Sequence, residues 1–425
     1  MKITSIAEYF WPQKFVTNDT VKVLVLSQHY WPETFRINEV VESLQKAGCC
    51  VSVLTGQPNY PDGAIFPGYR AMGVGAQMHD AGYMVYRVPV APRRQGRAVQ
   101  LISNYLSFLV SASLLGPWLL RGQRFDVIFV YGISPILQAI PGVVLKRFKR
   151  AALVTWVQDL WPQSLEATGF VRNRRILTAV AVLVRWIYRR CDLLLVQSQA
   201  FVRPVQSMAD KTPVKYHPNP GELAFTQTQS LAPPALVLEQ GFNVVFAGNL
   251  GTVQALGTLL DAAELLRPNA DVRMVLVGSG SCSEWLQQEV ARRQLGNVQL
   301  PGRFVSEAMP GILAQASALL VSLVCSPVMG QTVPSKLQAY LAAGRPIIAS
   351  LDGEGARVVE ESGAGLACRA EDAAALAQAI LKLQAMPEVE LNRMGESGKR
   401  YYQQHFEPTM LAKRLMQHFE MVAGR

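Results

Sequence analysis

Glycine-rich turns in the second half of the chain are the first residues whose types and spacing point to chemistry. "FAGNLG" places Gly248, Asn249 and Gly251 between a strand-like run and a helical pattern, and "VGSG" repeats the arrangement around Gly278. Free backbone N–H groups and the helix dipole at such turns favour a phosphate group. The GxGxxG spacing of dinucleotide-binding proteins is absent from these turns, which counts against NAD or FAD.

A lysine at a predicted helix start supports the same hypothesis. In "VPSKLQAYLAAG", Pro334 suits the beginning of a helix, and Ser335 and Lys336 fall in its first turn. The helix dipole disfavours a cation there, so an anion bound in front of the helix would explain Lys336. A solvated lysine on a surface helix is the simpler alternative.

Polar residues also follow the strand-like runs of the first half. Asp159, in "VQDLWPQSL", could orient a substrate hydroxyl or act as a base, and it would serve equally well as a helix cap. Glu33, Arg36 and Asn38, in "SQHYWPETFRINEV", lie in the first predicted loop between a strand and a helix. Such loops usually border a ligand cleft.

The loop that contains Glu33 has an imperfect copy upstream. An offset of 20 aligns Trp11, Pro12, Phe15 and Asn18 of "EYFWPQKFVTND" (8–19) with the identical residues of "HYWPETFRINEV" (29–40). The upstream copy carries Gln13 and Val16 in place of Glu33 and Arg36. The first copy runs directly into the next strand and leaves no room for a crossover helix. We therefore expect the second copy to be functional, and residues 1–20 to be an added segment. That segment would be a surface remnant of duplication, an extra edge strand or a membrane contact.

Short apolar, β-branched runs alternate with helical patterns in both halves, which predicts an α/β fold with doubly wound parallel sheets. The strands are expected at 21–27, 49–56, 125–132, 152–159, 192–198, 242–249, 272–280, 298–302, 318–323 and 346–350, with helices at 255–266, 283–295 and 335–343. A stretch rich in Pro, Asn and Thr (209–235) indicates a domain junction. We predict Rossmann-like domains over 21–220 and 221–407 that face each other across a cleft, and a final helix within 408–425.

Composition restricts the class of protein. Half of the residues are apolar and 17% are charged, which argues against disorder. Residues 1–220 hold 25 Lys and Arg against 12 Asp and Glu, whereas 221–425 hold 16 against 19. A basic first half suits an anionic membrane or a polyanion.

The six cysteines form no CxxC motif, as is typical of a reduced cytosolic protein, and the five histidines are too scattered to predict a metal site. Nucleic acid is not expected, because no aromatic-basic stacking motif is present.

Two apolar stretches are candidates for membrane contact. Residues 97–123 have nearly the length of a transmembrane helix, but several Ser, Gln and Asn residues and a Gly-Pro pair interrupt them. A core helix, a helix in the membrane interface and a true span all remain open. Residues 172–192 carry six arginines around an apolar middle, which suits an anionic lipid surface or a core helix with solvated ends. With the basic balance, they favour peripheral attachment to a membrane.

Seven blocks in order resemble the family-4 glycosyltransferases of the GT-B fold. Within that family they resemble the WbuB and WcaI type, which acts in bacterial O-antigen, lipopolysaccharide, capsule and exopolysaccharide synthesis. The blocks cover nearly the whole chain from Val21 and read "SQHYWPETFRINEV", "TGQPNYPDG", "VQDLWPQSL", "FAGNLGTVQALGTLLDAAELL", "LVGSG", "NVQLPGR" and "VPSKLQAYLAAGRPIIAS". Residues 1–20 lie outside the family pattern.

The resemblance implies a retaining transfer from a nucleotide-diphosphate sugar that binds to the C-terminal domain. The expected donor-binding residues are Gly248, Asn249, Gly251, Gln254, Gly278, Arg303, Gln331, Ser335 and Lys336, and the expected acceptor-binding residues are Arg36, Asn38, Asn59 and Tyr60. The catalytic candidates are Asp159, Lys336 and Glu33, with Asp159 expected to position substrate more than to transfer a proton. No metal and no other cofactor is expected, because no DxD motif is evident.

The chain departs from the family at two places. Asn249 and Gln254 stand where the wider family has an Arg and a Lys that hold the diphosphate. Gln331 and Ala339 stand where it has a pair of glutamates. Lys336 is then the replacement cation, and it would stabilise the leaving diphosphate together with helix N-termini.

The resulting expectation is a metal-independent hexosyltransferase with a UDP-sugar donor, for which the resemblance suggests UDP-N-acetyl-L-fucosamine. The acceptor would be a polyprenyl-diphosphate-linked saccharide. The resemblance implies a cytoplasmic protein attached peripherally to the inner face of the bacterial cytoplasmic membrane. A nucleotide-sugar 2-epimerase of the same fold is one alternative, although it would need neither the basic face nor the apolar stretch. A non-catalytic scaffold for polysaccharide assembly is the other, and the missing glutamates favour it slightly.

Overall fold

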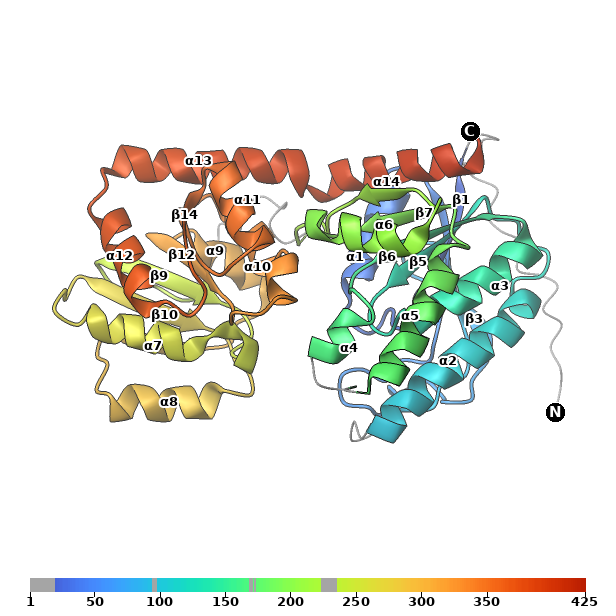
Figure 1. The fold of residues 1–425 in the computed structure, drawn as a ribbon, viewed down its shortest axis with the longest axis horizontal. Coiled ribbons are helices and arrows are strands. Elements are labelled where there is room, and N and C mark those ends of the chain that lie inside the picture. The colour runs from blue at the N-terminus through green and yellow to red at the C-terminus, as the bar shows by residue number, and fades with distance from the viewer. Residues whose placement is uncertain (1–19, 94–97, 168–170, 172, 223–234) are drawn as a thin grey trace. The chain divides into compact units, whose positions relative to one another are not determined.

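The computed structural model describes residues 20–93, 98–167, 171, 173–222 and 235–425. The added segment predicted over residues 1–20 therefore lies, apart from Thr20, outside the described residues. The described chain forms two α/β sheets (Figure 1). Each was expected from the alternation of apolar runs and helical patterns, and the predicted fold class is confirmed.

The first sheet has eight strands in the order β3-β4-β2-β1-β5-β6-β7-β8. They are β1 (Lys22–Leu26), β2 (Cys50–Thr55), β3 (Gly75–Met78), β4 (Met84–Arg87), β5 (Val127–Gly132), β6 (Ala152–Val157), β7 (Leu193–Val196) and β8 (Val214–Tyr216). β1 pairs in parallel with β2 on one side and with β5 on the other, whereas β3 runs antiparallel to β4. The loop after β1 therefore lies where the strand order changes direction, a usual place for a ligand.

Helices connect these strands. They are α1 (Arg36–Lys46), α2 (Ala98–Leu119), α3 (Ile140–Lys149), α4 (Gln163–Ala167), α5 (Arg174–Tyr188) and α6 (Val202–Ala209), with short 3-10 turns η2 (Ile136–Ala139) and η3 (Gln199–Phe201). Helix α1 buries Ile37, Val40, Val41 and Leu44, which recur at the spacing of one helix face.

The second sheet has six strands in the order β11-β10-β9-β12-β13-β14. They are β9 (Phe242–Ala247), β10 (Val272–Val277), β11 (Val298–Gly302), β12 (Ala318–Ser322), β13 (Ile347–Ser350) and β14 (Gly365–Cys368), all paired in parallel. In chain order this is the 3-2-1-4-5-6 arrangement of a Rossmann-like domain. Its strand order changes direction between β9 and β12, so a ligand is expected beyond the carboxyl ends of these two strands.

Both faces of the second sheet are covered by helices. The helices are α7 (Leu256–Leu265), α8 (Ser283–Arg292), α9 (Met309–Leu313), α10 (Ser335–Ala343), α11 (Glu354–Ser362), α12 (Ala373–Gln384) and α13 (Glu388–His405), with 3-10 turns η5 (Thr252–Gln254), η6 (Ser306–Ala308) and η7 (Met329–Gln331). Val244 and Phe246 of β9 pack with α7 and α12, whereas Val245 and Ala247 pack with α10. Because alternate residues of a strand point to opposite faces, a strand covered on both faces is apolar throughout.

Sequence reasoning missed four strands. β3 (GAQM) is mostly exposed and β4 is short, while β8 has only three residues and lies inside the Pro-rich stretch that predicted a junction. β14 (GLAC) contains a glycine and an alanine among its four residues. None of the four shows a long run of β-branched residues, so each depends on pairing with a neighbouring strand. The predicted final helix is present as α14 (Pro408–Ala423).

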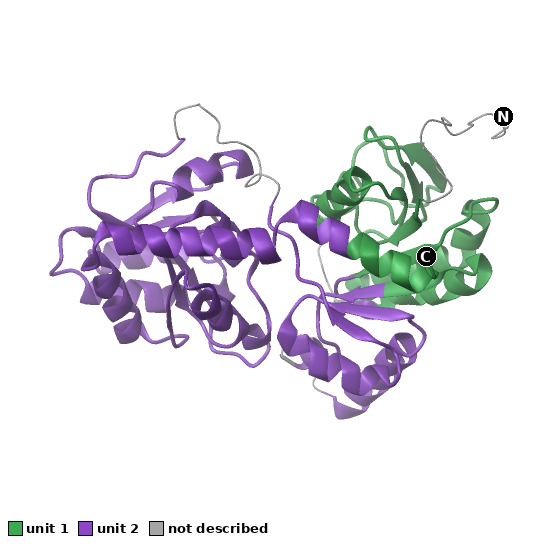
Figure 2. Ribbon diagram, turned by 90° about the horizontal axis from the view of Figure 1, so that it is seen from above, with its two compact units in different colours: residues 1–131, 137–154, 415–425 green, residues 132–136, 155–414 purple. Residues whose placement is uncertain are grey.

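The chain divides into two compact units, and each is described here by itself. Unit 1 comprises residues 1–131, 137–154 and 415–425, and unit 2 comprises residues 132–136 and 155–414 (Figure 2). The loop with Glu33 belongs to unit 1, and the glycine-rich turns and Lys336 belong to unit 2. The domain boundary predicted near residue 220 stays a prediction.

Candidate active site

A cavity of about 810 Å³ lies in unit 2 at the carboxyl ends of β9, β10 and β12. Gly248 and Asn249 follow β9, Gly278 follows β10, and Ser335 and Lys336 begin α10. All five line the cavity. Strand order thus brings together residues that are almost ninety positions apart in sequence, at the place where this type of sheet binds ligands.

Two glycines allow the walls of this cavity to approach each other. Gly278 has a φ of +143°, and a Cβ atom built on it would lie 1.8 Å from the carbonyl oxygen of Gly248. Gly248 has a φ of +135°, and its Cβ would lie 2.5 Å from Cε of Lys336. Side chains at either position would collide with the backbone or with Lys336. The glycines therefore leave space for the lysine between the turns.

Lys336 is a largely buried cation with no carboxylate partner among the described residues. Its Nζ donates a hydrogen bond to Oε1 of Gln254 at 3.0 Å and lies 3.7 Å from the centre of the Phe246 ring. Burial lowers the pKa of Lys336 to about 7, because the charged form loses hydration. An anion in the cavity would stabilise the charged form and offset that loss.

The structure brings together most of the predicted donor-binding residues. Gly248, Asn249, Gln254, Gly278, Arg303, Ser335 and Lys336 line the cavity. Gly251 and Gln331 are not among its lining residues. Gly251 precedes the η5 turn, and the backbone carbonyl of Gln331 accepts a hydrogen bond from Oγ of Ser198 at 2.6 Å. Ala339, which stands where the family has a glutamate, does line the cavity.

Sequence reasoning missed Tyr340 in this cavity. Its hydroxyl accepts a hydrogen bond from the amide of Ala247 at 2.8 Å and lies 3.3 Å from the carbonyl oxygen of the same residue. Tyr340 thus links α10 to the last residue of β9, immediately before Gly248. Its spacing in the sequence could have identified it. Residues four apart share a helix face, and Tyr340 follows Lys336 by four.

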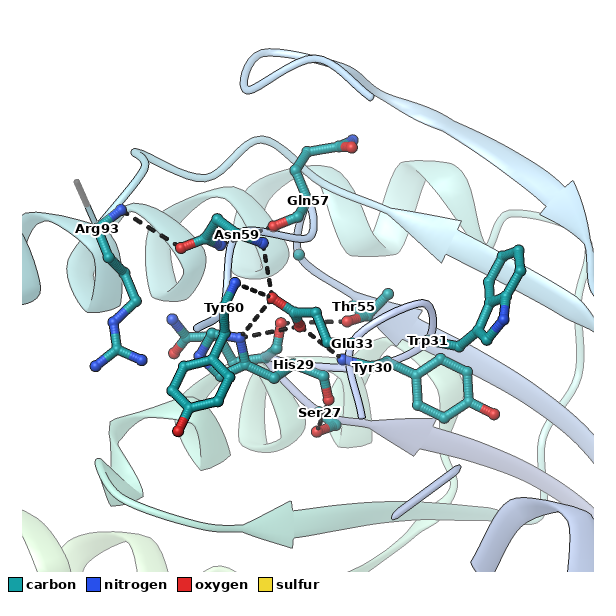
Figure 3. Close-up of polar contacts among 12 residues, drawn as sticks. Ser27, His29, Tyr30, Trp31, Glu33, Thr55, Gln57, Asn59, Tyr60 and Arg93 are labelled. Atoms are coloured by element: carbon teal, nitrogen blue, oxygen red, sulfur yellow. Dashed lines mark hydrogen bonds and ion pairs between the residues drawn. The ribbon is translucent and has the colours of Figure 1, made fainter. Parts of the chain in front are cut away.

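The loops after β1 and β2 in unit 1 meet at Glu33 (Figure 3). Its carboxylate is 1% exposed and accepts hydrogen bonds from the amides of Asn59 and Tyr60, both at 2.7 Å. The amide of Tyr30 and Nδ1 of His29 also lie within 3.2 Å of it. A carboxylate with this many donors holds the two loops together, and a direct contact with substrate is not its evident role.

Aromatic side chains surround this carboxylate. The His29 ring stacks on Phe35 with ring centres 5.1 Å apart, and both rings lie near Tyr60. Tyr60 is 38% exposed, and the guanidinium of Arg93 lies 5.2 Å from the centre of its ring. His29 and Arg93 were not predicted as site residues. Their position became visible only when the loops after β1 and β4 were placed beside each other.

The other predicted acceptor residues mainly support these loops. Asn59 is buried, and its Oδ1 accepts hydrogen bonds from Nδ2 of Asn104 and the amide of Arg93. Asn38 was expected in the loop after β1 but lies in the first turn of α1, because the helix already begins at Arg36. It accepts from the amide of Trp31 and donates to the carbonyl of Glu33 at 2.7 Å, so it braces the loop that precedes α1. Arg36 lies 3.7 Å from Glu39 in the first turn of α1.

Asp159 orders a turn in unit 2. Its Oδ2 accepts hydrogen bonds from the amide of Ser134 at 3.1 Å and from Oγ of Ser134 at 2.8 Å. Oγ of Ser134 also accepts from the indole N–H of Trp161. Asp159 therefore fixes the residues that follow β5 at the carboxyl edge of the first sheet.

Among the residues that the structure describes, no cluster of three or more His, Cys, Asp and Glu side chains could hold a metal ion.

Two family profiles match adjacent parts of the chain. "Glycosyl transferase 4-like domain" matches residues 34–220, and "Glycosyl transferases group 1" matches residues 241–385. The chain belongs to the family-4 glycosyltransferases. It has the GT-B fold, transfers sugar with retention of configuration and uses a nucleotide-sugar donor, as the sequence blocks implied.

This glycosyltransferase has named bacterial relatives. It is 25% identical over 316 residues to a protein of Pseudomonas aeruginosa named as glycosyltransferase WbjE, which covers 72% of this chain and 76% of that protein. It is 23% identical over 315 residues to the protein WcaI of Escherichia coli K12, named for glycosyl transfer in colanic acid biosynthesis, with the same coverage. The resemblance to the WcaI type is thereby confirmed as a distant relationship.

Solved structures share the fold of this glycosyltransferase at low sequence identity. Sucrose-phosphate synthase from Thermosynechococcus elongatus has a TM-score of 0.71 and 17% identity, over 95% of this chain and 99% of that chain. HepE of Anabaena, solved with UDP-glucose, has a TM-score of 0.62 and 16% identity, over 94% of this chain and 99% of that chain. These likenesses show the GT-B fold.

Proposed function

We propose that this glycosyltransferase transfers a sugar from a UDP-linked donor to a polyprenyl-diphosphate-linked saccharide in bacterial surface polysaccharide synthesis. UDP-N-acetyl-L-fucosamine is the donor we would test first. The observation that carries the proposal is the largely buried Lys336 at the start of α10, in a cavity of about 810 Å³ lined by glycine-rich turns. It is hydrogen-bonded to the neutral Gln254 and has no carboxylate partner among the described residues.

The cavity suits a diphosphate for physical reasons. When the bond between the anomeric carbon and the diphosphate oxygen breaks, negative charge develops on that oxygen. Lys336 and the free N–H groups at the start of α10 lie at the cavity and would stabilise this charge. A new bond then forms between the anomeric carbon and the acceptor oxygen on the same face of the sugar. The acceptor's proton passes to the departing diphosphate, so the step needs no protein base.

The choice of UDP and of a polysaccharide product is supported by related proteins. HepE was solved in complexes with UDP and with UDP-glucose, and WcaI is named for colanic acid biosynthesis. The UDP complexes describe HepE, and the naming for colanic acid biosynthesis describes WcaI. We extend them to this chain because it has the same fold as HepE and is homologous to WcaI.

The acceptor would meet the loops that Glu33 holds together. Tyr60 offers an exposed ring, and Arg93 offers a guanidinium beside it, which suits a phosphate group because its N–H donors form a planar fork. We assign Asn59, Asn38 and Arg36 to the support of this surface. Asp159 would position the acceptor, because it orders the turn at Ser134.

The test is thermal protection of the purified protein by a panel of UDP-, GDP- and dTDP-sugars. At a ligand concentration of one hundred times Kd, binding stabilises the folded state by about 2.7 kcal/mol, so the melting temperature rises. We expect a rise with UDP-sugars, and the largest rise with UDP-N-acetyl-L-fucosamine. The rise should be absent in Lys336→Ala and unchanged in Lys382→Ala, whose lysine is exposed on α12.

Each outcome decides a different part of the proposal. Protection by GDP- or dTDP-sugars alone would overturn the assignment of UDP. Equal protection of wild type and Lys336→Ala would overturn the role of Lys336. No protection by any nucleotide sugar would overturn the donor site in this cavity.

A further inference from the structure

Helix α2 of unit 1 exposes an apolar stripe along its whole length. Val99, Ile102, Leu106, Val110, Leu114 and Trp118 recur at intervals of three or four residues and are between 47% and 77% exposed. Residues 98–120 contain no charged side chain. At 1.5 Å per residue, the 22 residues of α2 give a stripe of about 33 Å. Such a surface is unusual for a protein in contact with water alone.

The opposite face of α2 is packed and hydrogen-bonded inside unit 1. Asn104 is fully buried, where its Oδ1 accepts from Nε2 of Gln28 and its Nδ2 donates to the carbonyl of Ala91, both at 2.7 Å. Oγ of Ser111 donates to the carbonyl of Pro89 at 2.7 Å. Further along, Gly116 lies so close to the core that a Cβ atom on it would be 3.2 Å from Leu54.

These contacts exclude a transmembrane position for α2 in the folded protein. By length and composition α2 is the one candidate span among the described residues, with a mean hydropathy of 1.4 over its best window. A spanning helix would have to give up the hydrogen bonds of Asn104 and Ser111, which hydrocarbon cannot replace. The helix can therefore offer one face to a membrane and keep the other on the protein.

Basic residues gather at the C-terminal end of α2. Arg121 and Arg124 follow the helix and are exposed, and so are Arg147 and Arg150 at the end of α3, beside the 67% exposed Phe148. Nζ of Lys149 donates to the carbonyls of Leu120 and Gln123, which ties the two helix ends together. Neither 98–125 nor 137–158 contains an acidic residue. The apolar stripe of α2 and the basic residues at the ends of α2 and α3 therefore lie on two helices that Lys149 ties together.

We propose that α2 lies lengthwise in the interface of an anionic lipid bilayer. Its stripe enters the boundary between headgroups and acyl chains, and the four arginines contact lipid phosphates. Amphipathic helices bind membranes in this way, with apolar burial and attraction to anionic lipid acting together. This inference does not depend on the identity of donor or acceptor, since binding to vesicles requires neither.

The position of α2 also connects the membrane with the acceptor loops. Nδ2 of Asn104, on the inner face of α2, lies 3.3 Å from Oδ1 of Asn59, and Arg93 precedes the helix by five residues. If the proposed acceptor is correct, its diphosphate would reach Arg93 from the lipid surface that α2 occupies.

The test is flotation of the purified full chain with vesicles of phosphatidylglycerol and phosphatidylethanolamine. We expect wild type to float with them, and the triple variant Leu106→Gln, Val110→Gln, Leu114→Gln to lose about tenfold or more in vesicle partitioning. A matched control, Val237→Gln, Leu265→Gln, Val389→Gln, also replaces three exposed apolar residues and should float like wild type. Arg147→Gln with Arg150→Gln should weaken binding to these vesicles and leave binding to phosphatidylcholine vesicles unchanged.

Thermal melting of each variant shows whether it is folded, and light scattering without lipid gives the oligomeric state. Equal flotation of wild type and the α2 variant would overturn the proposal. So would failure of wild type to float. A wild type that is dimeric and lipid-free, with a monomeric α2 variant, would show that the stripe is covered by a second copy of this chain.

Discussion

At the scale of the residue, Lys336 stands in the first turn of α10, where two effects oppose its positive charge. A lysine in the first turn of a helix opposes the helix dipole, and burial adds a loss of hydration. Its partners in the structure are the neutral side chain of Gln254 and the ring of Phe246. Among the described residues no carboxylate balances the positive charge of Lys336. We therefore assign that role to a bound diphosphate.

This leads to a prediction about pH. Without donor, the pKa of Lys336 is about 7, and a bound diphosphate favours the protonated form and raises that pKa. Affinity for a UDP-sugar should thus be greatest below pH 7 and fall as pH rises above it, by at most about tenfold per pH unit. Calorimetric titration across this range measures the effect.

The variant Lys336→Met is the control for this titration. It keeps a side chain of similar length but has no titrating group, so its binding should be weak and independent of pH in the same range. A wild-type affinity that stays constant from about pH 6 to about pH 9 would contradict the assigned role, because an uncharged lysine would then bind equally well.

At the scale of the element, the carboxylate of Glu33 joins the loops after β1 and β2. Its oxygens accept from amides on both loops, so the surface that carries Tyr60 depends on a residue that lies beneath it. The donor cavity has a similar arrangement, since Tyr340 of α10 holds the end of β9. In both places a buried polar residue determines the path of a loop.

We predict that Glu33→Gln destabilises the protein by about 1–3 kcal/mol, because an amide cannot accept from all of these buried N–H groups. Denaturant unfolding measures the change. The control is Glu396→Gln, which removes a carboxylate that is 64% exposed and paired with Lys399, and should cost less than about 1 kcal/mol. A stability equal to that of wild type would show that the Glu33 network is dispensable.

At the scale of the whole molecule, the excess of positive charge lies in residues 1–220, which include α2 and α3. The second half, which contains the donor cavity, is slightly acidic. Net charge acts over a Debye length, about 8 Å at 0.15 M salt and about 3 Å at 1 M. Apolar burial is not screened by salt.

Salt should therefore weaken only the electrostatic part of the binding to vesicles. We predict that binding of wild type to anionic vesicles weakens when salt is raised from about 0.15 M to about 1 M but does not vanish, because the α2 stripe still buries apolar surface. The α2 variant should lose its residual binding under the same conditions. Complete release of wild type at high salt would mean that attraction between charges alone holds the protein.

The sequence by itself determined the fold class and indicated that the glycine-rich turns and Lys336 would lie at one edge of the second sheet. Strands covered on both faces are continuous apolar runs, so β1, β2, β5, β9 and β12 were visible as local patterns. Parallel strands place their carboxyl ends at one edge, so the glycine turns and the start of α10 could be predicted to meet. Family blocks added residues such as Gln254 and Arg303.

Only the tertiary structure decided which side chains are buried and which are exposed to solvent. Glu33 looked like a reactive carboxylate and proved to be a buried acceptor for two loops, because burial and hydrogen bonding depend on contacts between distant segments. For residues 97–123 the sequence left a core helix, an interfacial helix and a span open, with the span the least favoured. The hydrogen bonds of Asn104 and the exposure of Leu114 separate these cases, since one apolar sequence can face protein or solvent according to what packs beside it.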